Sequence, residues 1–234
     1  MRSQVTYFFF AWSILLIACS RTVVEPENPG YDYFPLEEGN WIAYQVDSTV
    51  HDDDLGIHES FTYQVKELVD SAFTDNEGEQ AFMLKRFKRA TDTLPWVLSD
   101  VWTTKRNAFR AERVEENVRL IRLVFPARPD KEWNTNAENT REEWESEIVE
   151  VGNSSSIDGN SFQDVCEVLI HENLNAIEGE IAEAIYARDI GLIYFRLDTV
   201  RFNGFYPGIG QNWSDSLIDI GREFEMRYLE HGVE

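Results

Sequence analysis

The chain alternates between short runs of β-forming residues and polar breaks, and this pattern constrains the fold more than any other feature. Ile42, Tyr44 and Val46 recur at every second position, and Phe61 and Tyr63 continue the pattern in the next run. A period of two places such side chains on one face of a strand. Later runs carry β-branched and aromatic residues between Gly, Asn or Asp. They cover residues 82–87, 96–104, 108–114, 118–125, 144–151, 162–171, 181–187, 192–200 and 222–230.

Two segments carry more specific local signals. Residues 75–78 (DNEG) are typical of a hairpin turn, and after it Phe82, Leu84 and Arg86 share one face of the next strand. Residues 175–188 fit a helix by the spacing of their isoleucines, but Gly179 costs about 1 kcal/mol in a helix interior relative to alanine. The sequence YARDIGLIY at 186–194 is typical of strand–turn–strand. We therefore predict a strand there.

About eleven strands without intervening helices predict an all-β fold. We expect an antiparallel, strongly curled sheet or partly open barrel of roughly 10–11 strands, with at most one short helix, because curling protects the sheet edges. No fixed repeat is visible, which argues against a propeller or a solenoid. Aromatic residues make up 13% of the chain. They either line a ligand cavity in the curled sheet or fill its interior and brace strand pairs.

The N-terminus has the parts of an export signal. Arg2 is the one charge before an apolar run that ends in Leu16-Ile17-Ala18-Cys19. This run is shorter than the ~20 residues that span a bilayer as a helix, and its last four residues resemble the lipobox of bacterial lipoproteins. The resemblance implies that residues 1–18 are a signal peptide and that Cys19 is acylated. Several acyl chains on Cys19 anchor a protein durably.

The rest of the chain predicts a tether and one domain. Residues 19–33 include EPENPG, which is typical of a flexible linker. Residues 34–234 have a size that suits a single β-rich domain. The formal charge is −22, from 43 acidic and 21 basic residues. Such a surface repels phosphate backbones, so we expect no nucleic-acid partner.

Three short motifs resemble those of an uncharacterised family of Bacteroidota outer-membrane lipoproteins. They are FPLEEGNWIAY at 34–44, GNSFQDV at 159–165 and YARDIGLIY at 186–194. The resemblance implies an outer-membrane address but no activity. Retention in the inner membrane would need Asp directly after the cysteine, but Ser20 stands there. The first acidic residue after Cys19 is Glu25. Because surface-exported lipoproteins of this lineage carry acids directly after the cysteine, a periplasmic face is favoured.

Five triplets resemble the O-glycosylation sequon of exported Bacteroidota proteins. Each consists of Asp, then Ser or Thr, and then an apolar residue or a second Thr. Their hydroxyl residues are Ser48, Ser71, Thr93, Thr199 and Ser216. Asp-Ser and Asp-Thr are also common turn formers that precede strands, so both interpretations stay open. Any glycan is expected on an exposed strand end.

Candidate chemistry is sparse. Residues 51–59 (HDDDLGIHE) hold the densest set of metal-ligating side chains, but consecutive acids on a strand face opposite ways, and we predict a solvated hairpin loop and no metal or cofactor. Glu142, Glu143, Glu145 and Glu147 offer carboxylates for a glycosidase pair, or a charged outer face. We expect no catalytic residue. We interpret Cys166 as a structural cysteine. The loop 202–213 is either a flap that touches a ligand or an exposed hairpin loop.

Three functions remain open. The first is a non-enzymatic, lipid-anchored envelope lipoprotein that binds a protein or an envelope component. The second is a carrier of an apolar or glycan ligand in an aromatic-lined curled sheet. The third is a lipid-anchored hydrolase. A continuous apolar cavity favours the carrier, whereas a water-excluded pair of carboxylates in a cleft favours the hydrolase.

Overall fold

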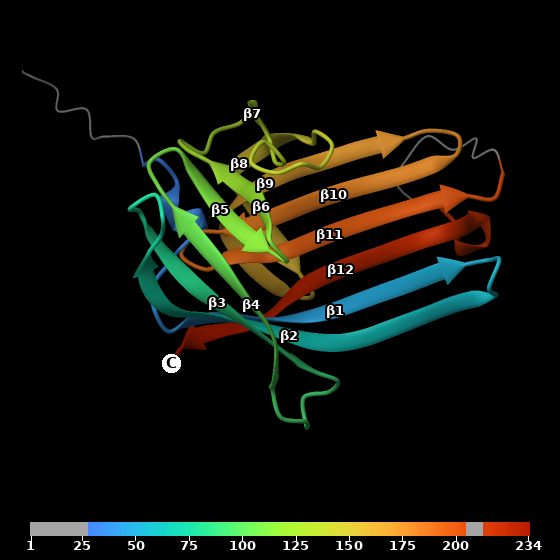
Figure 1. The fold of residues 1–234 in the computed structure, drawn as a ribbon, viewed down its shortest axis with the longest axis horizontal. Helices are drawn as coiled ribbons and strands as arrows, with labels where there is room; N and C mark the ends of the chain where they lie inside the picture. Colours follow the sequence, from blue (N-terminus) through green and yellow to red (C-terminus); the bar gives the residue numbers. More distant parts are fainter. Residues whose placement is uncertain (1–27, 205–212) are drawn as a thin grey trace, which may run out of the picture.

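The computed structural model describes residues 28–204 and 213–234 and shows the all-β fold that the sequence predicts. Twelve strands form one antiparallel sheet in the order β6-β5-β4-β3-β2-β1-β12-β11-β10-β9-β8-β7 (Figure 1). The strands are β1 (Asn40–Asp52), β2 (Ile57–Thr74), β3 (Gln80–Arg89), β4 (Val97–Arg106), β5 (Arg110–Glu115), β6 (Val118–Val124), β7 (Lys131–Asn134), β8 (Glu145–Ile157), β9 (Asn160–Leu174), β10 (Glu178–Ala187), β11 (Gly191–Phe202) and β12 (Ile218–Val233). Within the described ranges, the helical elements are two 3₁₀ turns, η1 (Tyr31–Tyr33) and η2 (Asp215–Leu217).

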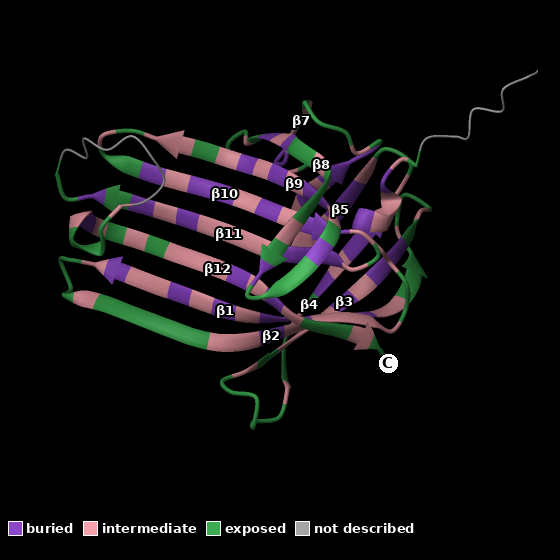
Figure 2. Cartoon of the chain, turned by 180° about the vertical axis from the view of Figure 1, so that it is seen from behind, coloured by how far each residue is buried: buried purple, intermediate pink, exposed green. Residues whose placement is uncertain are grey.

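The extra strand relative to the prediction is β7. It is four residues long and pairs with β8, so its alternation is too short to be recognised in the sequence. The ambiguous segment 175–188 forms β10, which confirms the predicted strand. Buried and partly exposed residues alternate along β1 and β9–β12, as expected for strands that cover an interior (Figure 2).

The sheet curls until its two edge strands meet. The Ile121 amide of β6 donates to the Thr135 carbonyl just after β7, at 3.0 Å. The Trp133 indole and the Thr135 hydroxyl both donate to the Ile121 carbonyl, at 3.0 and 3.1 Å. These bonds replace a full ladder between β6 and β7, so the sheet is barrel-like and nearly closed. We call this contact the seam.

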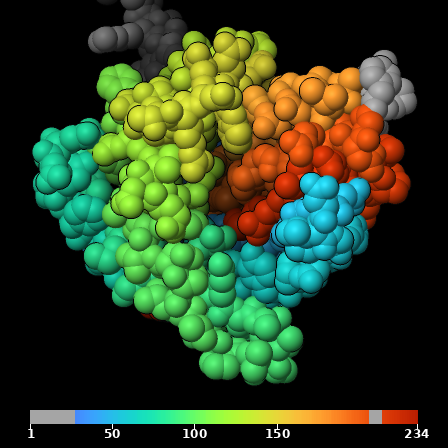
Figure 3. Space-filling model, turned by 45° about the vertical axis from the view of Figure 1, so that its right-hand side comes forward, coloured from blue at the N-terminus to red at the C-terminus, as the bar shows by residue number. Residues whose placement is uncertain are grey.

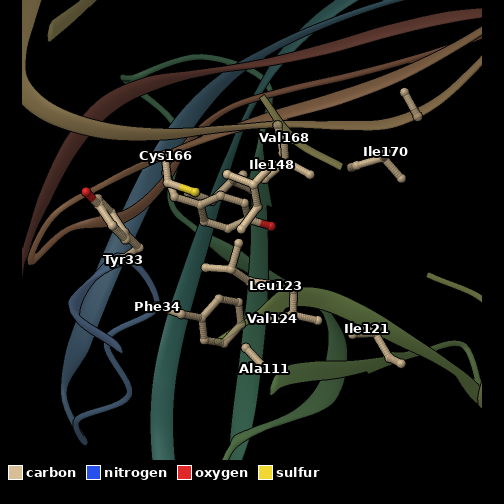
Figure 4. Packing of buried hydrophobic residues seen from close by; sticks show 14 of the residues in the cluster. Tyr33, Phe34, Ala111, Ile121, Leu123, Val124, Ile148, Cys166, Val168 and Ile170 are labelled. Atoms are coloured by element: carbon tan, nitrogen blue, oxygen red, sulfur yellow. The ribbon is translucent and has the colours of Figure 1, made fainter. Parts of the chain in front are cut away.

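The largest cluster of buried apolar side chains lies inside the sheet, and the chain that leads into β1 contributes to it. Tyr33 and Phe34 are 1% and 6% exposed. Figure 4 shows Phe34 near Val124 and Ala111, and Tyr33 on the side of Cys166. The folded unit therefore reaches upstream of Phe34, where we expected the domain to begin.

A cluster of polar groups fixes this segment to the turn after β10. The Arg188 guanidinium donates to the Asp164 carboxylate at 2.6 Å and to the Tyr33 hydroxyl at 3.1 Å, and it also pairs with Asp32. The Asp189 amide donates to the Asp32 carbonyl at 2.8 Å. We call Asp32, Tyr33, Asp164 and Arg188 the N-terminal clamp.

The signal peptide, Cys19 and residues 205–212 lie outside the described residues. The predicted cleavage and acylation therefore stay predictions. The twelve described strands all follow residue 39, so a chain that begins at Ser20 keeps this whole sheet.

Candidate ligand-binding cavity

The curled sheet encloses a cavity of about 560 Å³ between two walls. One wall consists of β2–β6 and the other of β9–β12. Figure 3 shows the surface hollowed between the yellow-green segments around β5–β7, the orange and red strands β10–β12, and the cyan tip of β1 and β2. Four exposed lining residues mark the mouth: Glu116, Arg141, Glu142 and Arg222.

The wall of β9–β12 is mostly apolar. Ile170, Ala182, Leu197, Phe224 and Met226 line it. The last two residues stand two apart on β12, as the pleat of a strand requires for side chains that share a face. These five side chains offer a ligand an apolar surface, while Glu180, Thr199 and Arg222 add polar groups to the same wall.

The opposite wall carries charges deep in the cavity. Its ionisable side chains are Glu67 on β2, Arg86 on β3, Arg113 and Glu115 on β5, and Arg122 on β6. Each is at most 22% exposed. We call these five residues the charged wall. Glu67 and Arg86 are direct register partners on neighbouring strands, which brings their opposite charges together.

The ion pairs of the charged wall are of unequal quality. Arg113 lies 3.1 Å from the nearer oxygen of Glu67 and 3.7 Å from Glu115, and Arg122 pairs closely with Glu115. Arg86 lies 3.7 Å from Glu67, beyond good hydrogen-bond distance. The Nε atoms of Arg86 and Arg113 are buried without a hydrogen-bond partner among the described residues.

Aromatic groups support these cations. The Arg86 guanidinium lies 4.7 Å from the centre of the Trp102 ring, and that of Arg113 lies 5.9 Å from the same ring. The Trp102 indole donates to Glu116 at 3.2 Å. Cation–π contacts of this kind stabilise guanidinium groups that are removed from water.

The buried carboxylate at Glu115 is held ionised. Burial raises its pKa, but the charges and hydrogen bond of Arg122 and the charge of Arg113 outweigh burial and lower it below its ordinary value. Burial raises the pKa of Tyr186, which also lines the cavity, to about 12. Glu115 is therefore a poor proton donor at neutral pH.

Phe34 forms the inner end of the cavity. A second cavity of about 340 Å³ shares Phe34, Glu67, Arg113 and Leu192 with the first, so these residues separate the two. The second cavity reaches Trp41 and His231 near the ends of β1 and β12. The N-terminal segment thus divides the interior.

The five sequon residues lie in different surroundings. Thr93 and Ser216 are exposed, and Ser71 is partly exposed. Ser48 is 3% exposed and accepts a hydrogen bond from Arg222 at 2.9 Å, while Thr199 lines the cavity. Only the exposed sites match our expectation of a glycan on an accessible strand end, and modification of Thr93 and Ser216 remains a prediction.

The residues 51–59 form the β1–β2 hairpin, with Asp53 and Asp54 exposed in its turn. His51 is buried, and its Nε2 lies 3.0 Å from Glu223. The Nδ1 atoms of His51 and His58 lie 3.0 Å apart. The histidines therefore bind each other and β12 rather than sharing a site with the turn aspartates.

Another acidic group surrounds a lysine. Asp75, Glu77 and Glu79 place carboxylate oxygens close together, and all three pair with the Lys105 ammonium. Burial opposes the charge on Lys105, but the three carboxylates outweigh burial and hold its pKa above its ordinary value. The lysine occupies the position that a cation would take.

The remaining candidates are structural. Glu145 and Glu147 alternate with buried Ser146 and Ile148, which confirms a charged outer face, and Glu142 lies at the mouth of the cavity. Burial raises the pKa of the Cys166 thiol to about 12, so it is a poor nucleophile. Of the aromatic residues in loop 202–213, Phe202 and Trp213 pack with ring centres 5.7 Å apart, and the central part lies outside the described residues.

Sequence reasoning did not find the charged wall. The one available signal was Arg86, which continues the inward positions of Phe82 and Leu84 on β3. A charged residue at an inward position needs a partner inside the fold, but the sequence does not show which strands supply it.

Comparison with known proteins gives limited matches. No family model matches the chain. It is 26% identical over 158 residues to the pheromone-processing carboxypeptidase kex1 of Neosartorya fischeri, a match that covers 63% of this chain and 24% of that protein. A Bacteroides fragilis protein with a YmcC-like fold, assigned as exported, aligns with a TM-score of 0.43 at 10% identity, over 84% of this chain and 98% of that one. Among the described residues, we find no helix with the length and apolar character needed to span a membrane.

Proposed function

We propose that this protein is a lipid-anchored envelope lipoprotein that carries an apolar ligand inside its curled sheet. The cavity of about 560 Å³ is the observation that carries this proposal. Its volume lies within the roughly 300–1,000 Å³ typical of small-molecule sites. Of the three functions open from the sequence, the cavity favours the carrier. The lipobox-like Leu16–Cys19 motif supports the envelope address.

The charged wall argues against a hydrolase in this cavity. A pair of catalytic carboxylates needs one partner that stays protonated near neutral pH. Glu67 and Glu115 each face arginines, and the pKa of Glu115 is lowered rather than raised. Both carboxylates therefore serve as counter-ions of the arginines.

The test is binding of the uncharged fluorescent probe N-phenyl-1-naphthylamine to the chain from Ser20 onward. The probe gains fluorescence on entering an apolar site. We expect saturable binding that Ala182→Trp abolishes, because Ala182 is buried on the apolar wall and the indole would fill the cavity. Leu197→Phe, at a less buried lining position, should weaken binding less.

The matched control is Ala72→Trp, an exposed position on β2. It should bind the probe as the unaltered chain does. Thermal melts establish that each variant is folded. Equal binding by folded Ala182→Trp and Ala72→Trp would show that the probe does not enter the cavity, and the carrier proposal would then be wrong.

A further inference from the structure

The cavity has a charge balance unlike that of the rest of the molecule. The whole chain has 43 acidic and 21 basic residues. Five arginines and five glutamates line the cavity: Arg86, Arg113, Arg122, Arg141, Arg222, Glu67, Glu115, Glu116, Glu142 and Glu180. A cavity that held only an apolar ligand would gain nothing from buried guanidinium groups, because removing a charge from water is costly.

In the charged wall, cations outnumber anions. Three arginines face two glutamates, which leaves one positive charge beyond the pairs. Arg113 pairs best with Glu67 and Arg122 with Glu115, so the excess falls on Arg86. The Arg86 guanidinium rests on the Trp102 ring and reaches the Met226 sulfur of the opposite wall at 3.6 Å.

We infer that the cavity binds an amphipathic ligand with a single anionic group, a carboxylate or a phosphate, placed at Arg86. This inference rests on the proposed carrier function and names the class of its ligand. Guanidinium groups present paired N–H donors that match the oxygens of carboxylates and phosphates. The Nε atoms of Arg86 and Arg113 are buried and have no hydrogen-bond partner among the described residues. The apolar body of the ligand lies against Leu197, Phe224 and Met226.

The experiment compares four ligands with the same alkyl chain: dodecanoate, dodecyl phosphate, dodecanol and dodecylamine. Each displaces N-phenyl-1-naphthylamine from the chain that begins at Ser20, below its micelle concentration and at a mildly alkaline pH. We expect dodecanoate or dodecyl phosphate to bind at least about tenfold more tightly than dodecanol. The cationic dodecylamine should bind most weakly. The two anionic arms separate a carboxylate from a phosphate ligand.

Arg86→Met is the decisive variant. It removes the excess positive charge and keeps an unbranched side chain in the same place. The ion pairs Arg113–Glu67 and Arg122–Glu115 are unchanged. The preference for the anion should fall to about the level of dodecanol, with binding of the uncharged probe retained. Arg86→Lys keeps the charge and should retain a reduced preference. Arg201→Met, at an exposed arginine outside the cavity, is the matched control and should change nothing.

The outcomes separate the two proposals. If dodecanol binds as tightly as both anions, or if Arg86→Met keeps the preference, the anionic-ligand inference is wrong and the carrier proposal stands. If neither the uncharged probe nor any of the four ligands binds, the carrier proposal fails and takes the inference with it.

Discussion

Single residues in this fold owe their chemistry to burial. Cys166 lies in β9, in the same buried apolar cluster as Ile148 and Val168, and it is fully buried. The sequence already indicated a structural cysteine, because its run is strand-like and carries no neighbouring cation. Arg86 shows the opposite case. Its inward position follows from alternation, but its partners lie on other strands and depend on the register between them.

The first prediction concerns the thiol. Burial, with smaller contributions from Glu167 and Asp164, raises the pKa of Cys166 to about 12, so little thiolate is present in the folded protein at about pH 8. We expect the native chain from Ser20 onward to react with Ellman's reagent only as fast as it unfolds. Denaturant should restore the rate of a free thiol. Fast labelling of the folded protein would show that Cys166 is accessible.

At the scale of elements, the seam is the weakest part of the sheet. β1 and β12 pair over thirteen residue pairs, whereas β7 pairs with β8 over four. The Thr135 hydroxyl donates to the Ile121 carbonyl and lies 2.7 Å from the Ser146 hydroxyl. Few local contacts predict low-energy opening.

We therefore predict that amides of residues 131–135 exchange with solvent faster than those of β1. Thr135→Val removes buried hydrogen bonds and leaves partners unsatisfied, which should lower the free energy of unfolding by about 1–3 kcal/mol. Chemical denaturation measures this change. Thr91→Val, at an exposed position in the β3–β4 hairpin, is the control with little expected effect. Slower exchange in β7 than in β1 would contradict a weak seam.

The alternation of the long strands was predictable because each buries one face over many residues. The turn at 75–78 was predictable from its residues, and the strand at β10 from the glycine within it. The seam was not predictable from the sequence, because β7 is too short to show a period of two and its contact with β6 depends on how far the whole sheet curls. The same curl creates the cavity, which explains why its lining escaped detection.

At the scale of the whole molecule, paired carboxylates make the fold sensitive to acid. The hydrogen bond from Lys85 lowers the pKa of Asp70, and that from Lys105 lowers the pKa of Asp75 and Glu79. A carboxyl group whose pKa is lower in the folded protein than in the unfolded chain stabilises the fold at pH values above its pKa in the unfolded chain. This stabilisation is lost as the pH falls to its pKa in the folded protein. Burial raises the pKa of Glu167 and Asp198, so protonation of these two carboxyls at low pH favours the folded protein.

We expect the melting temperature to fall once the pH drops below about 4, because the unfolded chain then binds protons at Asp70, Asp75 and Glu79 while the folded protein, with lowered pKa values, does not yet do so. Lys105→Met should flatten this fall, because Asp75 and Glu79 lose the partner that lowers their pKa. Lys88→Met, at an exposed lysine, should leave the curve unchanged. An identical acid response in all three proteins would exclude Lys105 as its origin.

The anchor gives the last prediction. We expect the mature protein to begin at Cys19 and to incorporate labelled palmitate, whereas Cys19→Ala should remain larger and unlabelled. Protease treatment of intact cells then tests the outer-membrane, periplasmic orientation that the sequence favours. Protection of the domain together with periplasmic controls supports it. Rapid loss of the domain from intact cells would place it on the surface instead, and labelling of Cys19→Ala would make the anchor assignment wrong.

The N-terminal clamp also gives the molecule a direction. It ties the incoming chain to the turn between β10 and β11, whereas Glu180 and Thr199, at the far ends of these two strands, lie toward the mouth of the main cavity. With lipid on Cys19, the tether would join the domain at the clamp, at the end of β10 and β11 opposite the mouth of the cavity. Cargo that enters through the mouth would then do so away from the point where the tether joins the domain.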